Sequence, residues 1–288
     1  MTAAGPELVF GEKTWLMGII NVTPDSFSGD GLAAPGRSKD EIVSAAVDQA
    51  RAFVRAGAEI LDVGAESTRP ASVYGDRPPV NPETEAALAV PVVAAMVREL
   101  GGAALVSIDT SHASVARAAL AAGATIVNDV WGARRDPGTA QAAAAAGAHL
   151  VVMHNQERAN YPDGVVPAVI AWLREAVERA RELGVPRARL LVDPGIGFGK
   201  ATAQSLELLH RLREIKDALG LPLLVGTSRK RFIGDVLDNA PLDERLEGTA
   251  ASVALAIAGG ADVVRVHDVA PIARTVRVAD AIVRFHPR

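Results

Sequence analysis

One pattern recurs along this chain: a short run of Ala and Gly stands directly before a short run of leucine or β-branched residues. It is found at Ala56-Gly57-Ala58, Ala122-Gly123-Ala124, Ala146-Gly147-Ala148 and Gly259-Gly260-Ala261. Because glycine enters the left-handed region of the backbone without steric cost, each run predicts the end of a helix and a turn into a strand. The chain is therefore expected to alternate helices with strands.

Between these turns lie segments with apolar residues at helical spacing, which predict helices over 38–55, 82–100, 166–183 and 204–219. Short apolar runs predict strands over 15–20, 60–63, 105–108, 126–130, 150–153, 190–193, 223–225 and 263–266. This alternation predicts an α/β fold, a closed (β/α)8 TIM barrel that forms a single domain over residues 1–288. A doubly wound open sheet is the alternative, but it usually has a glycine-rich phosphate motif after its first strand, and the sequence has none there.

The composition excludes several classes of function. The formal charge is -4, from 30 basic and 34 acidic residues without a basic block, so the chain is not expected to bind nucleic acid. There is no cysteine, which excludes disulfides, thiolate catalysis and cysteine-bound zinc and is compatible with a cytoplasmic location. The sequence has no long uncharged apolar span and no signal peptide pattern, so no membrane association is expected.

Polar residues close nearly every predicted strand, at the end where a barrel of this kind places its active site. They are Asn21, Asp62, Asp109, Asn128, Asp129, His154, Asp193, residues 228–230, Arg265 and His267. Carboxylates and amides in a dry pocket suit a flat heterocycle with N–H donors and ring acceptors, whereas Arg and His suit a phosphate anion. An acid at a strand end is often only the cap of the next helix, and Asp62 and Asp129 are the two most readily assigned to that role. After Asp109, we expect Thr110 or Ser111 to cap the helix while Asp109 faces the site.

Three connections are unusual for plain turns. Residues 21–31 and 66–82 are long and polar, and we interpret them as lids or substrate clamps in preference to flexible surface. The segment DPGIGFGK at 193–200 has three glycines after a strand but lacks the ending of a Walker loop. Its glycines indicate either a phosphate turn or a backbone that lies close to a flat ligand.

The ordered motifs of the chain resemble those of the dihydropteroate synthases, a family of pterin-binding barrels, over essentially the full length. The motifs are GIINVTPDSFS at 18–28, DVGAESTRP at 62–70, SIDT at 107–110, NDV at 128–130, MH at 153–154, DPGIGFGK at 193–200, TSRK at 227–230 and RVHD at 265–268. The resemblance implies a cytoplasmic transferase of folate biosynthesis, which condenses 6-hydroxymethyl-7,8-dihydropterin diphosphate with p-aminobenzoate and releases diphosphate. It also implies a homodimer through the last helices, packed by the Ala-rich stretch 248–259.

The resemblance also implies a role for individual residues. The expected pterin-binding residues are Asp109, Asn128, Met153, Asp193, Lys230 and Arg265. The expected p-aminobenzoate pocket consists of Phe27, Thr68, Arg69, Pro70, Phe198 and Lys230. The expected diphosphate site consists of Asn21, Thr68, Arg265 and His267, with Asn21 also holding the Mg2+ cofactor. The expected catalytic residues are Asp109, Asp193, Lys230, Arg265 and His267.

The implied chemistry needs no side-chain nucleophile. Departure of diphosphate from the methylene of an electron-rich pterin leaves a resonance-stabilised cation, and Mg2+ with Arg265 and His267 would stabilise the leaving group. Asp109 and Asp193 would favour the pterin cation. The amine of p-aminobenzoate would then attack in a pocket from which water is excluded once both long loops close.

The chain departs from the family pattern in its two long loops. The usual acid of the first loop is displaced by one residue to Asp30, and Ala65 and Ala71 replace glycines in the second. Loop closure and the roles of Asp25 and Asp30 therefore stay open. One alternative is a methyltetrahydrofolate-dependent methyltransferase, which has the pterin pocket but no use for a diphosphate site. A second is a pterin-binding protein without turnover, which only the altered first loop favours.

Overall fold

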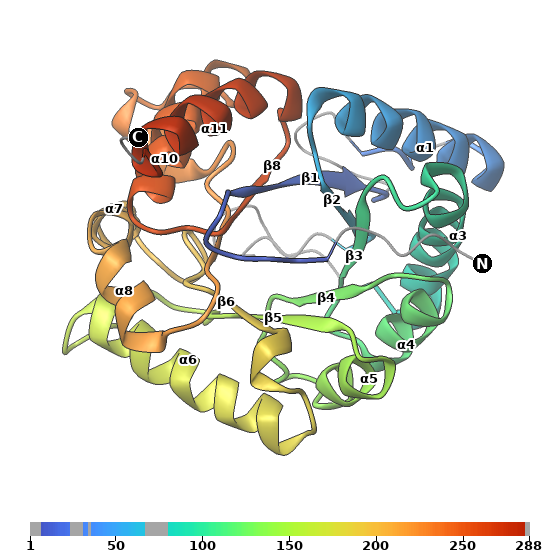
Figure 1. The fold of residues 1–288 in the computed structure, drawn as a ribbon, viewed down its shortest axis with the longest axis horizontal. Helices are drawn as coiled ribbons and strands as arrows, with labels where there is room; N and C mark the ends of the chain where they lie inside the picture. The colour runs from blue at the N-terminus through green and yellow to red at the C-terminus, as the bar shows by residue number, and fades with distance from the viewer. Residues whose placement is uncertain (1–6, 24–30, 34–35, 67–79, 286–288) are drawn as a thin grey trace.

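A computed structural model describes residues 7–23, 31–33, 36–66 and 80–285, in which strands alternate with helices (Figure 1). The strands are β1 (Trp15–Asn21), β2 (Ile60–Gly64), β3 (Leu105–Asp109), β4 (Ile126–Asp129), β5 (His149–Met153), β6 (Leu190–Asp193), β7 (Leu224–Val225) and β8 (Val263–Val266). The helices are α1 (Lys39–Ala56), α3 (Pro82–Leu100), α4 (Ala113–Ala121), α5 (Gly138–Ala146), α6 (Val165–Glu182), α7 (Thr202–His210), α8 (Leu212–Leu219), α9 (Arg231–Val236), α10 (Leu246–Ala258) and α11 (Val269–Val283). Two short 3-10 helices are η1 (Arg187–Arg189) and η2 (Leu242–Glu244).

The strands form one eight-stranded parallel sheet in the order β6-β5-β4-β3-β2-β1-β8-β7. The gap between its two edges is bridged by a parallel pairing of Val192 with Leu223, beside a hydrogen bond of 2.9 Å from Val192 N to Pro222 O. Figure 1 shows the helices as a ring around the strands. The predicted (β/α)8 barrel is therefore confirmed, and the open sheet is excluded.

Glycines end several helices as the sequence predicts. Gly57 follows α1 with a φ of 110°, Gly147 follows α5 with a φ of 64°, and both donate their backbone N–H to the last turn. The beginning of α1 is equally well specified, because Ser38 and Glu41 form a capping box. These local devices position each strand at the end of the preceding helix.

One helix differs from its predicted form. The helix expected over 204–219 is two helices, α7 and α8, which meet at Arg211 with φ -103° and ψ 24°. No Gly or Pro stands at this break, and nothing in the structure explains why it falls at Arg211.

No helix within the described ranges is both long and apolar enough to cross a membrane.

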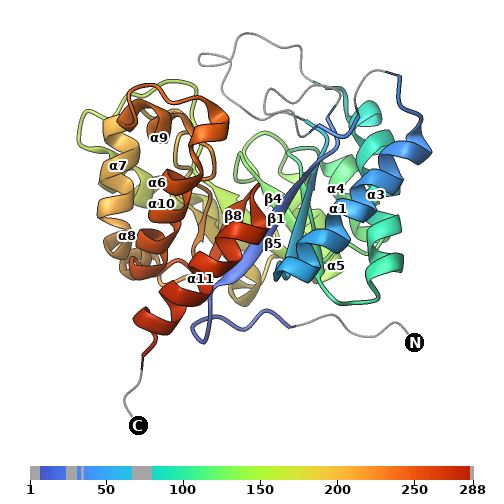
Figure 2. The same ribbon diagram turned by 90° about the horizontal axis from the view of Figure 1, so that it is seen from above.

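The inside of the barrel is apolar at one end and polar at the other. Side chains alternate along each strand, so every second residue points into the barrel. The inward residues nearest the amino ends form a compact apolar cluster together with Leu8, which precedes β1. This cluster is here called the floor: Leu8, Trp15, Met17, Ile60, Leu105, Ile126, Val151, Leu191, Leu224 and Val263. Figure 2 shows the strands running side by side toward one end of the barrel. That end, at which the strands finish, is here called the mouth.

Candidate active site

Polar side chains occupy the inward positions that follow the floor. Continuing the alternation by two residues from the floor positions reaches Asp62, Ser107, Asn128, Met153, Asp193 and Arg265, and a further two residues along β3 reaches Asp109. All of these side chains except Arg265 are buried, and Arg265 is 22% exposed. The strands thus bring together residues that are up to about 200 positions apart in the chain. This agrees with the prediction that the polar residues closing the strands meet at one end of the barrel.

Arg265 is the centre of a buried hydrogen-bonded network. Its Nε donates to Asp62 Oδ2 at 2.6 Å, and its Nη2 donates to Asp109 Oδ2 at 2.8 Å. The amide of Asn128 donates to the same Asp62 oxygen at 2.9 Å. One guanidinium is therefore shared by two carboxylates in a dry environment.

Three buried oxygens of this network have no hydrogen-bond partner among the described residues. They are Asp62 Oδ1, Asp109 Oδ1 and Ser107 Oγ. A buried oxygen without a partner costs free energy, on the order of 1–3 kcal/mol each, unless something else supplies a donor. The mouth is therefore prepared for a ligand that presents several N–H groups.

The ionisable groups of the mouth have shifted pKa values, mainly because they are buried. Burial raises the pKa of the Asp109 carboxyl to about 8, against the opposing effect of Arg265. Burial also raises the pKa of Asp193, partly offset by Lys230. Burial lowers the pKa of Lys230 to about 8, although Asp193 acts in the other direction. For Arg265 burial is the largest single effect and lowers the pKa, but the charges of Asp62 and Asp109 outweigh it together with the other contacts, so the pKa is raised.

The loop after β6 places Phe198 beside Lys230. The Lys230 ammonium donates to the carbonyl oxygen of Ile196 and lies 4.7 Å from the centre of the Phe198 ring. At the start of the loop, Gly195 N donates to Asp193 Oδ1 at 2.6 Å, which orients that carboxylate. The predicted residues Asp193, Phe198 and Lys230 therefore lie together on one wall of the mouth.

Two glycines of this loop are required by the chain itself. Gly195 has a φ of +65°, and a Cβ there would stand 1.9 Å from the carbonyl oxygen of His154. Gly199 has a φ of +57°, and a Cβ there would stand 2.1 Å from the carbonyl oxygen of Gln156. The close approach that we inferred for a ligand is therefore made, at these two glycines, by the segment after β5.

A buried lysine holds the same loop from behind. Lys200 Nζ donates to the carbonyl oxygen of Phe198 at 2.8 Å and lies 2.9 Å from His154 Nδ1. Burial, reinforced by Lys200, lowers the pKa of His154 to about 3, so the ring is neutral and accepts this bond. The His154 ring packs against Tyr161 and Trp172, with its centre 6.0 and 5.1 Å from theirs, so its contacts hold the loops after β5 and β6 together.

The end of β8 presents His267 at the mouth, where Ser228 positions it. The Ser228 hydroxyl lies 3.0 Å from His267 Nδ1 and accepts from His267 N at 3.1 Å. Arg229, with a φ of 57°, turns away from this pair to make two hydrogen bonds of 2.9 and 2.6 Å with Asp268. Within 228–230 we assigned a role to Lys230 alone from the sequence, and we missed the contact that the Ser228 hydroxyl makes with His267.

The two acids that we assigned most readily to structural roles behave differently. Asp129 is structural, since it accepts from the backbone N of Trp131 at 2.8 Å and of Ala133 at 3.1 Å. For Asp62 the assignment is wrong, because it lies inside the barrel and binds Arg265. The expected cap of α4 is wrong as well: Asp136, not Thr110 or Ser111, accepts from Ala113 N at 2.8 Å.

Several predicted residues lie outside the described part of the chain. These are Phe27, Thr68, Arg69 and Pro70, together with the loop acids Asp25 and Asp30. Asn21 is described, ends β1 and is partly exposed at the mouth. It follows the floor residue Met17 by four positions along β1, which is an inward position next to the polar layer.

The fold and the polar mouth place the chain in a known class of enzyme. A family model described as "Pterin binding enzyme" matches residues 17–267. The chain is 44% identical over 275 residues to the dihydropteroate synthase of Bacillus subtilis, covering 96% of this chain and 90% of that protein. We therefore assign the chain to the barrel enzymes that bind pterins.

Solved structures narrow the class. A dihydropteroate synthase from Clostridium difficile, crystallised in the presence of pteroic acid, has a TM-score of 0.88 at 41% identity, and the match covers 97% of this chain and 100% of that one. The enzyme from Xanthomonas albilineans with 4-aminobenzoic acid has a TM-score of 0.85 at 38% identity, covering 96% and 95%. The chain belongs to the dihydropteroate synthases, the transferases of folate biosynthesis.

Proposed function

We propose that the mouth of this barrel joins the methylene carbon of a dihydropterin diphosphate to the amine nitrogen of p-aminobenzoate. The carbon–oxygen bond breaks with its electron pair leaving on the diphosphate, the amine lone pair forms the new bond, and the amine loses a proton. Membership of the dihydropteroate synthases supports this reaction, as do the relatives solved with pteroic acid and 4-aminobenzoic acid. The structure adds how individual residues of this chain would contribute.

The observation that carries the proposal is the set of buried oxygens without partners around Arg265. A pterin has ring N–H and amino groups along one edge, and these would donate to Asp109 Oδ1 and its neighbours. Asn128 and Asp193 would contact the same heterocycle, with Met153 against its face. Because Asp109 ionises with a pKa of about 8, its negative charge becomes available close to neutral pH to favour a pterin cation.

The leaving diphosphate would meet cations on the β8 side of the mouth. Arg265 uses Nε and Nη2 for the two carboxylates, which leaves its third nitrogen for a phosphate oxygen. His267, held by Ser228, would be the second donor. Mg2+ fits a donor set of one amide oxygen from Asn21 with diphosphate oxygens and water, since this ion keeps few protein ligands. When bound, it would neutralise charge on the leaving group.

The second substrate would bind beside Phe198 and Lys230. The Phe198 ring offers an apolar face for a benzene ring, and the Lys230 ammonium above it suits the carboxylate or the adjacent pterin. Phe27, Thr68, Arg69 and Pro70 would complete this pocket as the family resemblance implies. Their part of the proposal rests on the motifs of the two long loops.

The test is diphosphate release from 6-hydroxymethyl-7,8-dihydropterin diphosphate with Mg2+, measured with and without p-aminobenzoate. The wild type should form dihydropteroate, and Asp109→Asn should lower kcat by about 100-fold or more, as when one stabilising group is removed from a transition state. Asp217→Asn, an exposed acid near the end of α8 and on the side of the barrel opposite the mouth, is the control.

Two outcomes would favour the alternatives. Release that ignores p-aminobenzoate would contradict the second half of the reaction. A protein that binds the pterin without releasing diphosphate and without any response to p-aminobenzoate would fit a methyltransferase-like pocket. Tight pterin binding without release would indicate a binding protein that has lost turnover, with the displaced Asp30 as the first suspect.

We also propose a homodimer and a cytoplasmic location. Three large apolar side chains on α10 and α11 are strongly exposed: Leu255 at 67%, Val278 at 62% and Ile282 at 70%. Such a face is unusual on a monomer and fits an interface between two copies. Light scattering should give about twice the chain mass of 29.9 kDa, and a monomer would contradict the proposal. The absence of cysteine suits a reducing compartment.

A further inference from the structure

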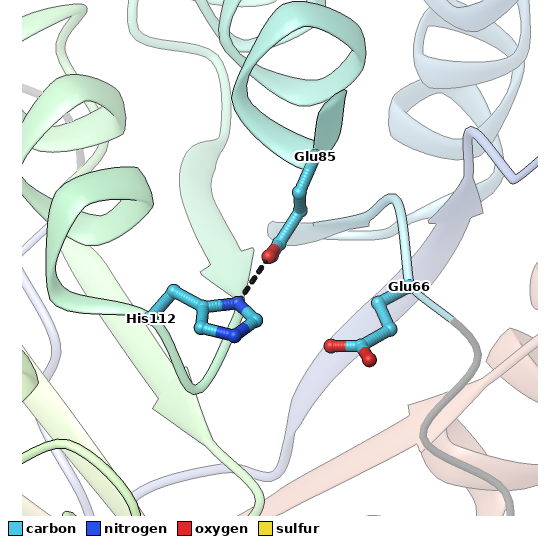
Figure 3. A group of neighbouring side chains, drawn as sticks. All are labelled: Glu66, Glu85 and His112. Atoms are coloured by element: carbon cyan, nitrogen blue, oxygen red, sulfur yellow. Dashed lines mark hydrogen bonds and ion pairs between the residues drawn. The ribbon is translucent and has the colours of Figure 1, made fainter. Parts of the chain in front are cut away.

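A second group of ionisable side chains lies at the mouth, on the side of β2 and β3 (Figure 3). Glu66 follows β2, His112 follows β3, and Glu85 is in the first turn of α3. One ligand atom of each residue lies within 4.8 Å of the others. None of these residues has a part in the reaction proposed above, so the cluster needs its own explanation.

The contact between Glu85 and His112 brings a carboxylate oxygen and a ring nitrogen together. His112 Nδ1 lies 2.6 Å from Glu85 Oε2, so a hydrogen bond joins the two atoms in the metal-free protein. A metal ion binds deprotonated ligands and can take the place of the proton in this bond, with Nδ1 and the Glu85 carboxylate as ligands on the same side of the ring. In Figure 3 the carboxylates of Glu85 and Glu66 approach the ring from two sides.

One carboxylate oxygen of the cluster is buried without a donor. Glu85 is fully buried at 0% exposure, and its second oxygen, Oε1, has no hydrogen-bond partner among the residues that the structure describes. Burial raises the pKa of Glu66, and the charge of Glu85 raises it further, although His112 and Arg135 act in the opposite direction. A buried carboxylate oxygen without a donor is costly, and a cation among the three residues would remove that cost.

We propose that Glu66, Glu85 and His112 form a binding site for a divalent first-row transition-metal ion, separate from the Mg2+ that accompanies the diphosphate. Two carboxylates and one imidazole are ligands that Zn2+ and Mn2+ accept, whereas Mg2+ prefers oxygen alone. Ligand atoms of a zinc site lie about 3.4 Å apart, so modest side-chain movements would close the cluster around an ion. Glu66, which is only partly buried, is the residue able to make them.

The test uses the substrate-free, untagged chain after removal of metal by a chelator, with Co2+ as a spectroscopic probe. Without diphosphate, Asn21 supplies a single ligand, so binding reports the new cluster. We expect one Co2+ per chain by equilibrium dialysis, a visible d–d absorption band, and displacement by Zn2+ but not by millimolar Mg2+. His112→Asn should weaken Co2+ binding by about 10- to 100-fold. His210→Asn, on the exposed side of α7, is the matched control and should bind as the wild type does.

Thermal unfolding separates this proposal from a plain buried ion pair. In Glu85→Gln the bond to His112 is kept while the charge is removed, so the metal-free variant should fold with a Tm at least equal to that of the wild type. Zn2+ should raise the Tm of the wild type and leave that of Glu85→Gln unchanged. The proposal is overturned if the wild type binds no Co2+, or if His112→Asn binds it as tightly as the wild type.

Discussion

Replacing Asp62 by Asn should move the pH dependence of catalysis through its effect on Asp109. Both carboxylates bind the Arg265 guanidinium, so their charges are on the order of 5 Å apart. At an effective dielectric constant of about 20, their repulsion is about 3 kcal/mol, which corresponds to about two pH units in a pKa. Burial is the larger cause of the raised pKa of Asp109, so in Asp62→Asn that pKa should fall from about 8 without reaching its usual 3.8.

The assay is kcat/KM for the pterin diphosphate as a function of pH, because this ratio reports groups of the free enzyme. If ionised Asp109 assists catalysis, the acid limb of the Asp62→Asn profile should lie about two pH units below that of the wild type. Asp262→Asn, a buried acid at the start of β8 and paired with Lys216, is the control and should leave the limb in place. An unmoved limb in Asp62→Asn would refute the shared-guanidinium argument.

Thermal unfolding offers an independent measure of the same pKa. A carboxyl whose pKa is raised in the fold stays neutral there while it ionises in the unfolded chain. The fold therefore loses stability as pH rises from the unfolded pKa toward the folded one, here from 3.8 to about 8. In Asp62→Asn this loss should end at a lower pH.

Two further predictions concern the wall of the mouth formed by the β6 loop. Gly195→Ala should lower the free energy of unfolding by about 3–5 kcal/mol in chemical denaturation, because a clash with the His154 carbonyl adds to the strain of a left-handed backbone. Gly147 is the control, since it has a similar φ but open space around it. Gly147→Ala should cost only about 1–2 kcal/mol. Equal losses would mean that the close approach is not restrictive. The activity of the wild type should decline at alkaline pH as Lys230 loses its proton with a pKa of about 8. Lys230→Arg should retain activity there, because arginine stays charged. If activity falls in the same way with rising pH in both proteins, this role of the lysine is contradicted.

The fold was predictable from the sequence because its determinants are local. The glycine at each helix end and the apolar run after it are contiguous, and the strands 190–193 and 263–266 were predicted with their observed bounds. The failure at Arg211 has the same origin, since the residues around it have helical spacing and no local breaker. Where a boundary depends on something other than nearby residues, pattern reasoning does not find it.

The sequence predicted the site residues that stand at strand ends, and it did not predict the contacts between them. Alternation places Asp109, Asn128, Asp193 and Arg265 inside the barrel, and the structure brings three of them into one network. Asp62 was misjudged because an acid before a loop has the same pattern whether it caps a helix or binds an arginine 203 positions away. Nothing in the sequence pairs Glu85 with His112, because the two residues meet only after α3 and β3 have packed.

The apolar floor has a consequence for the traffic of substrates. Because tightly packed side chains close the barrel at the amino ends of its strands, a pterin has one way in and the product has the same way out. In the proposed reaction, residues of the polar layer just above this seal would hold the pterin, and p-aminobenzoate would bind beside Phe198 on the wall formed by the loop after β6. The heterocycle would then have to enter first, and p-aminobenzoate bound before it would stand in its passage. A tube closed at one end would thus impose an order of binding on a reaction whose chemistry alone requires none.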